Sequence, residues 1–180
     1  MYRGTHCIIR TIEVDDAPVL SALYDPKRPR AALLDARREL APPTMDELRI
    51  ALGTTADQGL GMLHAIEDLE GRVLGFGSLR HTPKDHHFAL LSLMLLEDRD
   101  CLSPMGNEAC GFLLDEAFRH KLFRKVLAQA FEWEQTLREL LLLRGFTSDG
   151  TQRDVLRSSG HWHNMETLTV RRPALGPAAA

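Results

Sequence analysis

The chain has 180 residues, of which 44% are hydrophobic, and it carries a formal net charge of −3. This length and apolar content favour one compact domain with a single buried core. The acidic balance and the lack of a long basic run argue against a nucleic-acid-binding surface, which needs clustered Lys and Arg to neutralise phosphates.

The first residues and the cysteines bear on the cellular compartment. No apolar run reaches the ~18 residues of a membrane span, and the start lacks the apolar centre of a secretory signal, so we expect a cytosolic protein. Cys7, Cys101 and Cys110 show no C-x-x-C spacing, which argues against a disulfide framework and a structural zinc site. We expect reduced, partly buried thiols.

The first part of the chain predicts one strand and two helices. A β-branched strand at Cys7–Thr11 precedes a helix that begins near Asp15–Pro18, with a carboxylate cap and a proline in its first turn. Residues 24–43 contain four prolines and indicate a loop with a short helix. Thr44 and Glu47 then form a capping box that opens a second helix.

A modest basic cluster lies within the proline-rich loop. Its members are Arg28, Arg30, Arg37 and Arg38. Because they are spread among acidic residues, we interpret them as a solvated helix face rather than as a binding surface.

Three strands follow the second helix. Met62–Glu67 and Arg72–Arg80 flank a short polar turn and predict a hairpin. Gly75 and Gly77 share one face of the second strand, which leaves room there for another group to approach. Phe88–Leu96 is almost continuously apolar, as expected for a central strand covered on both faces.

Helices and strands alternate over the rest of the chain. The pattern predicts, in order, a helix over Met105–His120, a strand over Lys125–Phe131, a helix over Gln135–Arg144, and strands over Gln152–Arg157 and Asn164–Arg172. The element order predicts an α/β fold with a single mixed, mostly antiparallel sheet flanked by helices. We expect one domain over residues 1–173 and a frayed tail over residues 174–180.

Three short sequence motifs support a more specific interpretation of the fold and function. Gly71–Gly77 looks like a characteristic third strand, Gly106–Ala109 is similar to the Gly-Thr-Glu-Ala that opens a cofactor-binding helix, and Arg144–Gly150 is similar to a late Gly-Phe-x-x-x-Gly. Together they resemble the GNAT superfamily of N-acetyltransferases, in the branch of ribosomal-protein N-terminal acetyltransferases. The resemblance covers nearly the whole chain and implies transfer of an acetyl group from acetyl-CoA to a primary amine.

The family holds the pyrophosphate of acetyl-CoA on a Gln/Arg-x-x-Gly-x-Gly/Ala segment after the fourth strand. Here the three defining positions are Cys101, Pro104 and Gly106, so only the last matches. On one interpretation, Pro104 removes an N–H donor from the anion site. On the other, Ser103–Pro104 is an ordinary helix start that still offers its N–H groups to an anion. The expected donors are the N–H groups of Met105, Gly106 and Asn107.

Acetyl transfer also needs a base, a donor to the thioester oxygen and an acid. Glu97, at the end of the central strand, is the first candidate base and Asp98 the second, although a plain surface role is the alternative for both. The candidate oxyanion donor is the main-chain N–H of Leu93, Met94 or Leu95. These three residues are therefore grouped with the acetyl-CoA site.

No general acid is visible in the sequence. Many GNAT enzymes place a tyrosine in the last helix, whereas the tyrosines of this chain are Tyr2 and Tyr24. The branch also carries an Asn and a Ser in that helix, and Glu134 and Leu137 stand there instead. These departures leave catalysis open.

Eight histidines raise the question of a metal site. His86–His87 and the alternating pair His161 and His163 are the closest groupings, but neither has a third ligand at a familiar spacing. We expect no metal, and we interpret His161 or His163 as lining the acceptor site.

Three functions remain open from the sequence. The leading hypothesis is an acetyl-CoA-dependent N-acetyltransferase that acts on a small-molecule amine or a peptide N-terminus, without nucleic acid or membrane and with a homodimer as an option. The second is a catalytically inactive GNAT-fold module that senses a ligand or binds a partner. The third is a transferase with another acyl donor, for which the Gly75 and Gly77 face would provide room.

Overall fold

One mixed sheet organises the protein in the computed structural model, which describes residues 1–34, 42–55, 61–80 and 88–172. The strand order in the sheet is β1-β2-β3-β4-β5-β6-β8-β7, and β5 and β6 are the parallel pair in an otherwise antiparallel arrangement. The strands are β1 (Tyr2–Arg3), β2 (Ile8–Thr11), β3 (Gly61–Glu67), β4 (Val73–Arg80), β5 (Phe88–Leu95), β6 (Lys125–Phe131), β7 (Thr147–Ser158) and β8 (His161–Arg171). The predicted mixed, mostly antiparallel α/β sheet is confirmed.

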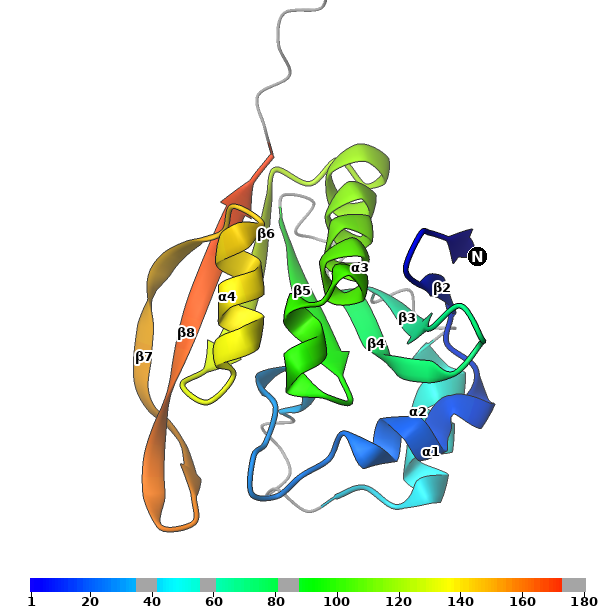
Figure 1. Ribbon diagram of the computed structural model, residues 1–180. Helices are drawn as coiled ribbons and strands as arrows, with labels where there is room; N and C mark the ends of the chain where they lie inside the picture. The colour runs from blue at the N-terminus through cyan, green and yellow to red at the C-terminus, as the bar shows by residue number, and fades with distance from the viewer. Residues whose placement is uncertain (35–41, 56–60, 81–87, 173–180) are drawn as a thin grey trace, which may run out of the picture.

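Helices cover both faces of this sheet. The longer ones are α1 (Ala17–Ala22), α2 (Met45–Thr55), α3 (Pro104–Asp115) and α4 (Gln135–Leu143). The short ones are the 3-10 turns η1 (Val14–Asp16), η2 (Ala31–Leu33) and η3 (Asp98–Leu102), and the π turn η4 (Glu116–His120). Figure 1 shows α3 and α4 over the same face of the sheet. No helix in the described ranges is long and apolar enough to cross a membrane.

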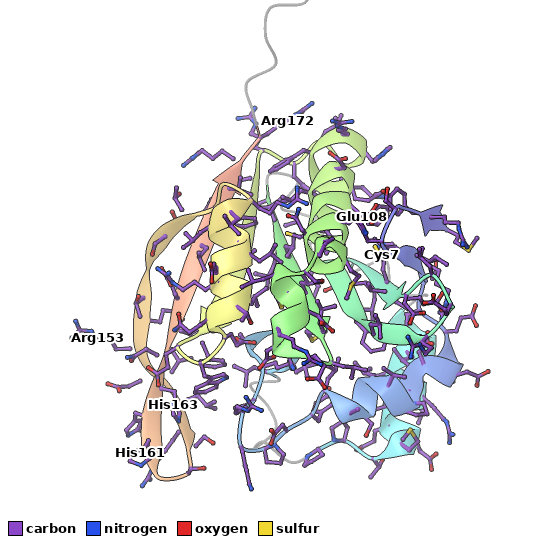
Figure 2. All side chains as sticks on the ribbon, in the orientation of Figure 1. Cys7, Glu108, Arg153, His161, His163 and Arg172 are labelled. Atoms are coloured by element: carbon purple, nitrogen blue, oxygen red, sulfur yellow. The ribbon has the colours of Figure 1, made fainter. Side chains whose placement is uncertain are left out.

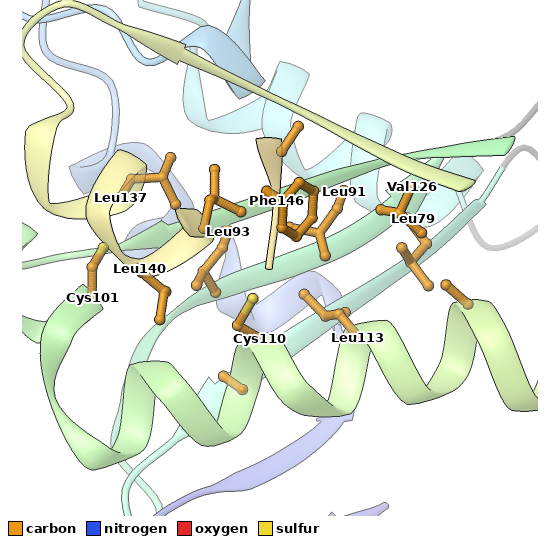
Figure 3. Packing of buried hydrophobic residues seen from close by; sticks show 14 of the residues in the cluster. Leu79, Leu91, Leu93, Cys101, Cys110, Leu113, Val126, Leu137, Leu140 and Phe146 are labelled. Carbon is orange, nitrogen blue, oxygen red and sulfur yellow. The ribbon is translucent and has the colours of Figure 1, made fainter. Parts of the chain in front are cut away.

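Side-chain alternation along the strands divides the core between the two faces. Ile66 packs in the cluster that contains Leu113 of α3 and Leu140 of α4, whereas the neighbouring Ala65 packs with α1 and α2. Successive strand residues point to opposite faces, so these two contacts place the helix pairs on opposite sides. Figure 3 shows the α3 and α4 side as a continuous apolar layer, with Leu93 of β5 between the helices.

Two predicted helix starts have different outcomes. The capping box of α2 is confirmed, because the Thr44 N–H donates to Glu47 at 2.9 Å and the Glu47 N–H donates to the Thr44 hydroxyl at 3.3 Å. The expected carboxylate cap before α1 is wrong. Asp16 instead pairs with both terminal nitrogens of Arg10 at 2.8 Å, and it accepts the Glu13 N–H.

The space expected beside Gly75 and Gly77 for an approaching group is filled by atoms of α3 and β5. A Cβ on Gly77 would lie 2.9 Å from the Leu113 side chain, and one on Gly75 would lie 2.8 Å from the Leu95 Cα. The glycines therefore let α3 and β5 approach β4 closely, and they do not widen a binding channel.

The last two strands are longer than predicted. β7 and β8 form an extended hairpin that turns at Ser159 and Gly160, both with positive φ. The expected tail at residues 174–180, His86, His87, Arg37 and Arg38 lie outside the described residues.

Candidate functional site

The sheet opens between its two parallel strands. β5 and β6 pair from Phe88 and Lys125 to Leu91 and Ala128. β5 then continues to Leu95 and β6 to Phe131 without further pairing between them. The two strands therefore part in their second halves, and backbone groups on their facing edges have no strand partner there.

The direction of the β5 amides selects among the candidate oxyanion donors. The Leu96 N–H donates to the Leu74 carbonyl at 2.9 Å, so in the antiparallel register the Met94 N–H also points toward β4. Alternate residues point their N–H groups the other way, which directs Leu93 and Leu95 toward β6. Because the β6 pairing has ended there, these two N–H groups face the opening.

The start of α3 is an ordinary capped helix. The Ser103 hydroxyl accepts the Gly106 N–H at 3.2 Å, and the Ser103 carbonyl accepts the Asn107 N–H at 3.0 Å. Pro104, which has no N–H, occupies the first turn. Two of the three predicted anion donors thus have internal acceptors, and the Met105 N–H is the one left at the helix start.

Gly106 also has a packing role that the sequence did not reveal. A Cβ at this position would collide with the Asp100 carbonyl and would lie 2.6 Å from the Cys101 carbonyl oxygen. The glycine therefore allows η3 to pack directly on α3. This contact explains the residue without a ligand.

A cation lies beside the first turns of α3. The Arg144 guanidinium, at the end of α4, donates to the Asn107 carbonyl, and its Nη2 lies 3.0 Å from where a Gly111 Cβ would be. The Arg144 Nε is buried and has no hydrogen-bond partner in the described part of the chain. Arg144 brings positive charge to the side of α3 between Asn107 and Gly111, a contact that the Gly-Phe motif alone did not indicate.

The two candidate bases have different surroundings. Glu97 is exposed, and its side chain does not cap η3. Asp98 pairs with Arg30 at 3.1 Å and with Arg28 at 3.6 Å. Both Asp98 carboxylate oxygens are thus engaged by arginines, whereas Glu97 is open to solvent.

The ion pairs with Asp98 also correct the interpretation of the basic cluster. The Arg30 side chain is only 17% exposed and connects the loop before η2 to the start of η3. It is therefore not part of a solvated helix face.

Glu134 connects the η2 segment to the end of β6 through hydrogen bonds. Its carboxylate accepts the Phe131 N–H at 2.8 Å and also the Ala31 N–H, and its burial raises its pKa. Leu137, the other unusual residue of this helix, packs in the core. Both departures from the family pattern thus have structural roles in this chain.

Buried thiols bear on the type of transfer. Burial raises the pKa of Cys101 to about 11 and that of Cys110 to about 12. The pKa of Cys7, which lies beside Glu108, is also raised to about 12 (Figure 2). Since the thiolate is the nucleophile, these cysteines are poor candidates for an acetyl-cysteine intermediate. All three are free thiols that are fully buried, where partial burial was expected.

An aromatic group lies on the opposite face from α3 and α4. Phe131 stacks on Trp133 at 4.7 Å between ring centroids, and His163 meets the Trp133 ring edge-on at 4.5 Å. The His163 Nδ1 lies 2.8 Å from Glu132. His161 is exposed at the start of β8 (Figure 2). No group of three potential metal ligands occurs among the described residues.

Comparison with known proteins identifies the architecture. No family model and no curated protein matches the sequence. The spermidine N-acetyltransferase from Vibrio cholerae, solved with CoA and spermine, superposes with a TM-score of 0.77 over 94% of this chain and 97% of that chain, at 14% identity. The fold is that of the GNAT acetyltransferases.

Other solved structures agree with this GNAT fold. An N-acetyltransferase from Staphylococcus aureus Mu50 is 20% identical, with a TM-score of 0.72 over 93% of this chain and 99% of that chain. A probable acetyltransferase is 19% identical, with a TM-score of 0.73 over 93% and 94%. The expected fold is confirmed, and the ribosomal-protein branch stays a prediction.

Proposed function

We propose that this protein is an N-acetyltransferase that moves the acetyl group of acetyl-CoA directly to a primary amine. The observation that carries the proposal is the opening between β5 and β6, with the Leu93 and Leu95 N–H groups directed into it. The N-acetyltransferase names of the GNAT-fold neighbours support the same reaction. The acceptor is a small-molecule amine or a protein N-terminus.

Two of the groups that acyl transfer needs, an oxyanion donor and a base, are proposed at the opening. The Leu93 or Leu95 N–H donates to the thioester oxygen, where negative charge develops as the amine attacks. Glu97 is the proposed base, acting directly or through water, because its carboxylate is exposed and Asp98 is held by two arginines. The high pKa values of the thiols favour direct transfer.

The start of α3 supplies the site proposed for the acetyl-CoA phosphates. The Met105 N–H and the helix dipole favour an anion there. Arg144 contributes a full positive charge nearby, through a guanidinium already in contact with Asn107. The Gly106 and Asn107 N–H groups join this site only if the phosphates displace their Ser103 acceptors.

Calorimetric titration with acetyl-CoA and CoA tests the binding part of this proposal. We expect saturable heat for both molecules, and a weaker response in Arg144→Gln than in the control Arg72→Gln, whose side chain is 77% exposed in the β3–β4 turn. No heat at high protein concentration would exclude acetyl-CoA as the donor.

Release of CoA thiol in the presence of a panel of amines tests the transfer. We expect Glu97→Gln to lower kcat and the turn residue Glu70→Gln to leave it unchanged. Equal activities for both variants would remove Glu97 from the mechanism.

A second candidate function is a catalytically inactive GNAT-fold module that binds a ligand or a partner. It is favoured by the helix start, where Pro104 lacks an N–H and Ser103 already occupies the Gly106 N–H. Binding of CoA without thiol release for any amine would favour this function. Detectable release would exclude it.

A further inference from the structure

The short turn η2 bridges the two strands that part at the opening. On one side, Arg30 directly precedes η2 and pairs at 3.1 Å with Asp98, which begins η3 just after β5. On the other side, the Ala31 N–H donates to the carboxylate of Glu134, which lies just after β6. We call residues 30–33 the η2 bridge, because they are anchored beyond the ends of both strands.

The η2 bridge lies over the stretch where β5 and β6 no longer pair. Ala31 packs with Phe131, the last residue of β6, and Leu33 packs against the cluster that contains Met94 of β5. Both strand residues lie beyond the last residue pair that joins β5 to β6. The turn contacts both strands, and Figure 1 shows its blue segment near the lower end of β5. The η2 bridge therefore covers the opening on this face of the sheet.

The face that carries the η2 bridge is the one left to the acceptor. Met94 packs with α1 and α2, whereas the neighbouring Leu93 packs with α3 and α4. The η2 bridge thus lies on the side opposite the helix start proposed for the acetyl-CoA phosphates. A donor that enters from the α3 side leaves the other side of the thioester carbon to the amine, so the amine has to pass the η2 bridge.

Both anchors of the η2 bridge involve charged groups that are shielded from water. Glu134 is 8% exposed, and it accepts the Phe131 N–H at 2.8 Å in addition to the Ala31 N–H. The Arg30 side chain is 17% exposed. Hydrogen bonds to charged groups are stronger than neutral ones, and salt screens them less where water is excluded. A wide acceptor would have to break at least one of these anchors.

We propose that the η2 bridge selects the acceptor by size, and that Arg30 and Glu134 are the specificity-determining residues that hold it closed. This inference rests on the proposed acetyltransferase function and decides between its two acceptor classes. A slender small-molecule amine enters beside the closed bridge, whereas a polypeptide N-terminus needs the bridge to open. The preferred acceptor is therefore a small-molecule amine with an unbranched chain next to the nitrogen.

The equilibrium between the closed and the open bridge sets the size of this preference. An acceptor that reacts only with the open form has its apparent affinity reduced by the fraction of open molecules. Loss of one hydrogen bond to a charged group raises that fraction about tenfold. A variant that lacks one anchor should therefore lose about that factor of discrimination against an extended acceptor.

Glycinamide and a hexapeptide that begins with glycine test the size selection, since both present the same α-amino group. Release of CoA thiol gives kcat/KM for each acceptor. We expect wild type to prefer glycinamide, and Arg30→Gln and Glu134→Gln to raise the relative kcat/KM of the hexapeptide about tenfold. Arg28→Gln is the matched control and should keep the wild-type ratio, because Arg28 pairs with the same Asp98 at 3.6 Å but is 66% exposed and precedes the η2 bridge.

Hydrogen exchange of the backbone amides separates an opened bridge from a damaged fold. Exchange within the η2 bridge should be faster in Arg30→Gln and Glu134→Gln than in wild type and Arg28→Gln, while exchange in α3 stays the same. A hexapeptide that wild type uses as readily as glycinamide, or a ratio that neither variant changes, would overturn this inference and leave the acetyltransferase function standing. Failure of wild type to transfer acetyl to any amine would overturn both.

Discussion

One histidine that is buried within the described ranges is expected to make the stability of the protein depend on pH. His64 on β3 is 7% exposed, its ring meets Phe112 edge-on at 5.4 Å, and its Nε2 has no hydrogen-bond partner among the described residues. Burial lowers the pKa of His64. The unfolded chain therefore binds the proton more readily than the native state does.

The sign of this effect predicts loss of stability at low pH. The contribution of a neutral buried histidine is complete above its ordinary pKa of 6.5 and is lost as the pH falls through the lower native value. We expect the free energy of unfolding of wild type to fall more between pH 7 and pH 5 than that of His64→Gln, which does not titrate. Urea denaturation at both pH values measures this difference.

The exposed His161→Gln is the control for this comparison, since it should follow wild type at both pH values. Parallel losses in wild type and His64→Gln would contradict the prediction.

Pro104 controls one hydrogen-bond donor at the proposed phosphate site. Pro104→Ala restores an N–H at the start of α3 while keeping a helix-forming residue. One charge-assisted hydrogen bond is worth about 1.5 kcal/mol, so we expect acetyl-CoA to bind roughly tenfold more tightly. Isothermal titration calorimetry measures the change.

Pro18→Ala is the matched control, because Pro18 occupies the same part of α1. Equal affinities of Pro104→Ala and wild type would mean that the phosphates do not contact this helix start.

Individual site residues were predictable where the signal was local. Ser103 and Pro104 are adjacent, and a serine followed by a proline is a common helix start. The structure has Ser103 as the N-cap and Pro104 in the first turn, as the interpretation of an ordinary helix start predicts. His163 and Arg144 meet partners far away in the chain, at Glu132 and Asn107. Their roles depend on tertiary contacts that periodicity does not encode.

At the scale of elements, the contact between η3 and α3 depends on a missing side chain. Gly106→Ala would place a methyl group against the backbone carbonyls of Asp100 and Cys101, which cannot rotate away. Overpacking of this kind costs about 1–3 kcal/mol. We expect a matching decrease in the free energy of unfolding, measured by urea denaturation.

Gly53 provides the opposite case within α2. A Cβ there meets no atom within 4 Å, so Gly53→Ala should stabilise the protein by about 0.5–1 kcal/mol through its helix propensity. A stabilising effect of Gly106→Ala would contradict the proposed packing role.

Elements with an apolar side were predicted well, and those without one were not. β5 and β6 were located almost to the residue, because each has a buried, apolar pattern. β7 is a sheet-edge strand that is exposed along most of its length, so its sequence carries no alternation to mark its start. The sequence pattern therefore locates a strand only where the strand buries apolar side chains.

At the scale of the whole molecule, the two helix layers differ in how much core they bury. The α3 and α4 face belongs to the largest apolar cluster, which also includes residues of β5, β6 and β8, whereas α1 and α2 cover a smaller one. Regions with fewer buried apolar contacts open at lower free energy. We expect the amides of α2 to exchange with deuterium before those of α3 and α4, as measured by mass spectrometry.

The acidic residue Glu47 anchors the start of α2, so Glu47→Ala should accelerate exchange in α2 and leave α4 unchanged. Exchange in α3 that is as fast as in α2 would show that the two layers open together.

The short parallel pairing between β5 and β6 has a consequence for the cohesion of the sheet. Four residue pairs join β1–β5 to the sub-sheet of β6, β8 and β7. Residues 96–124 separate the two strands in the chain, so the entropy of closing this segment opposes their pairing. A molecule bound in the opening touches both sub-sheets at once. Its binding energy therefore adds to the attraction between two halves of the protein that backbone pairing joins over only a short stretch.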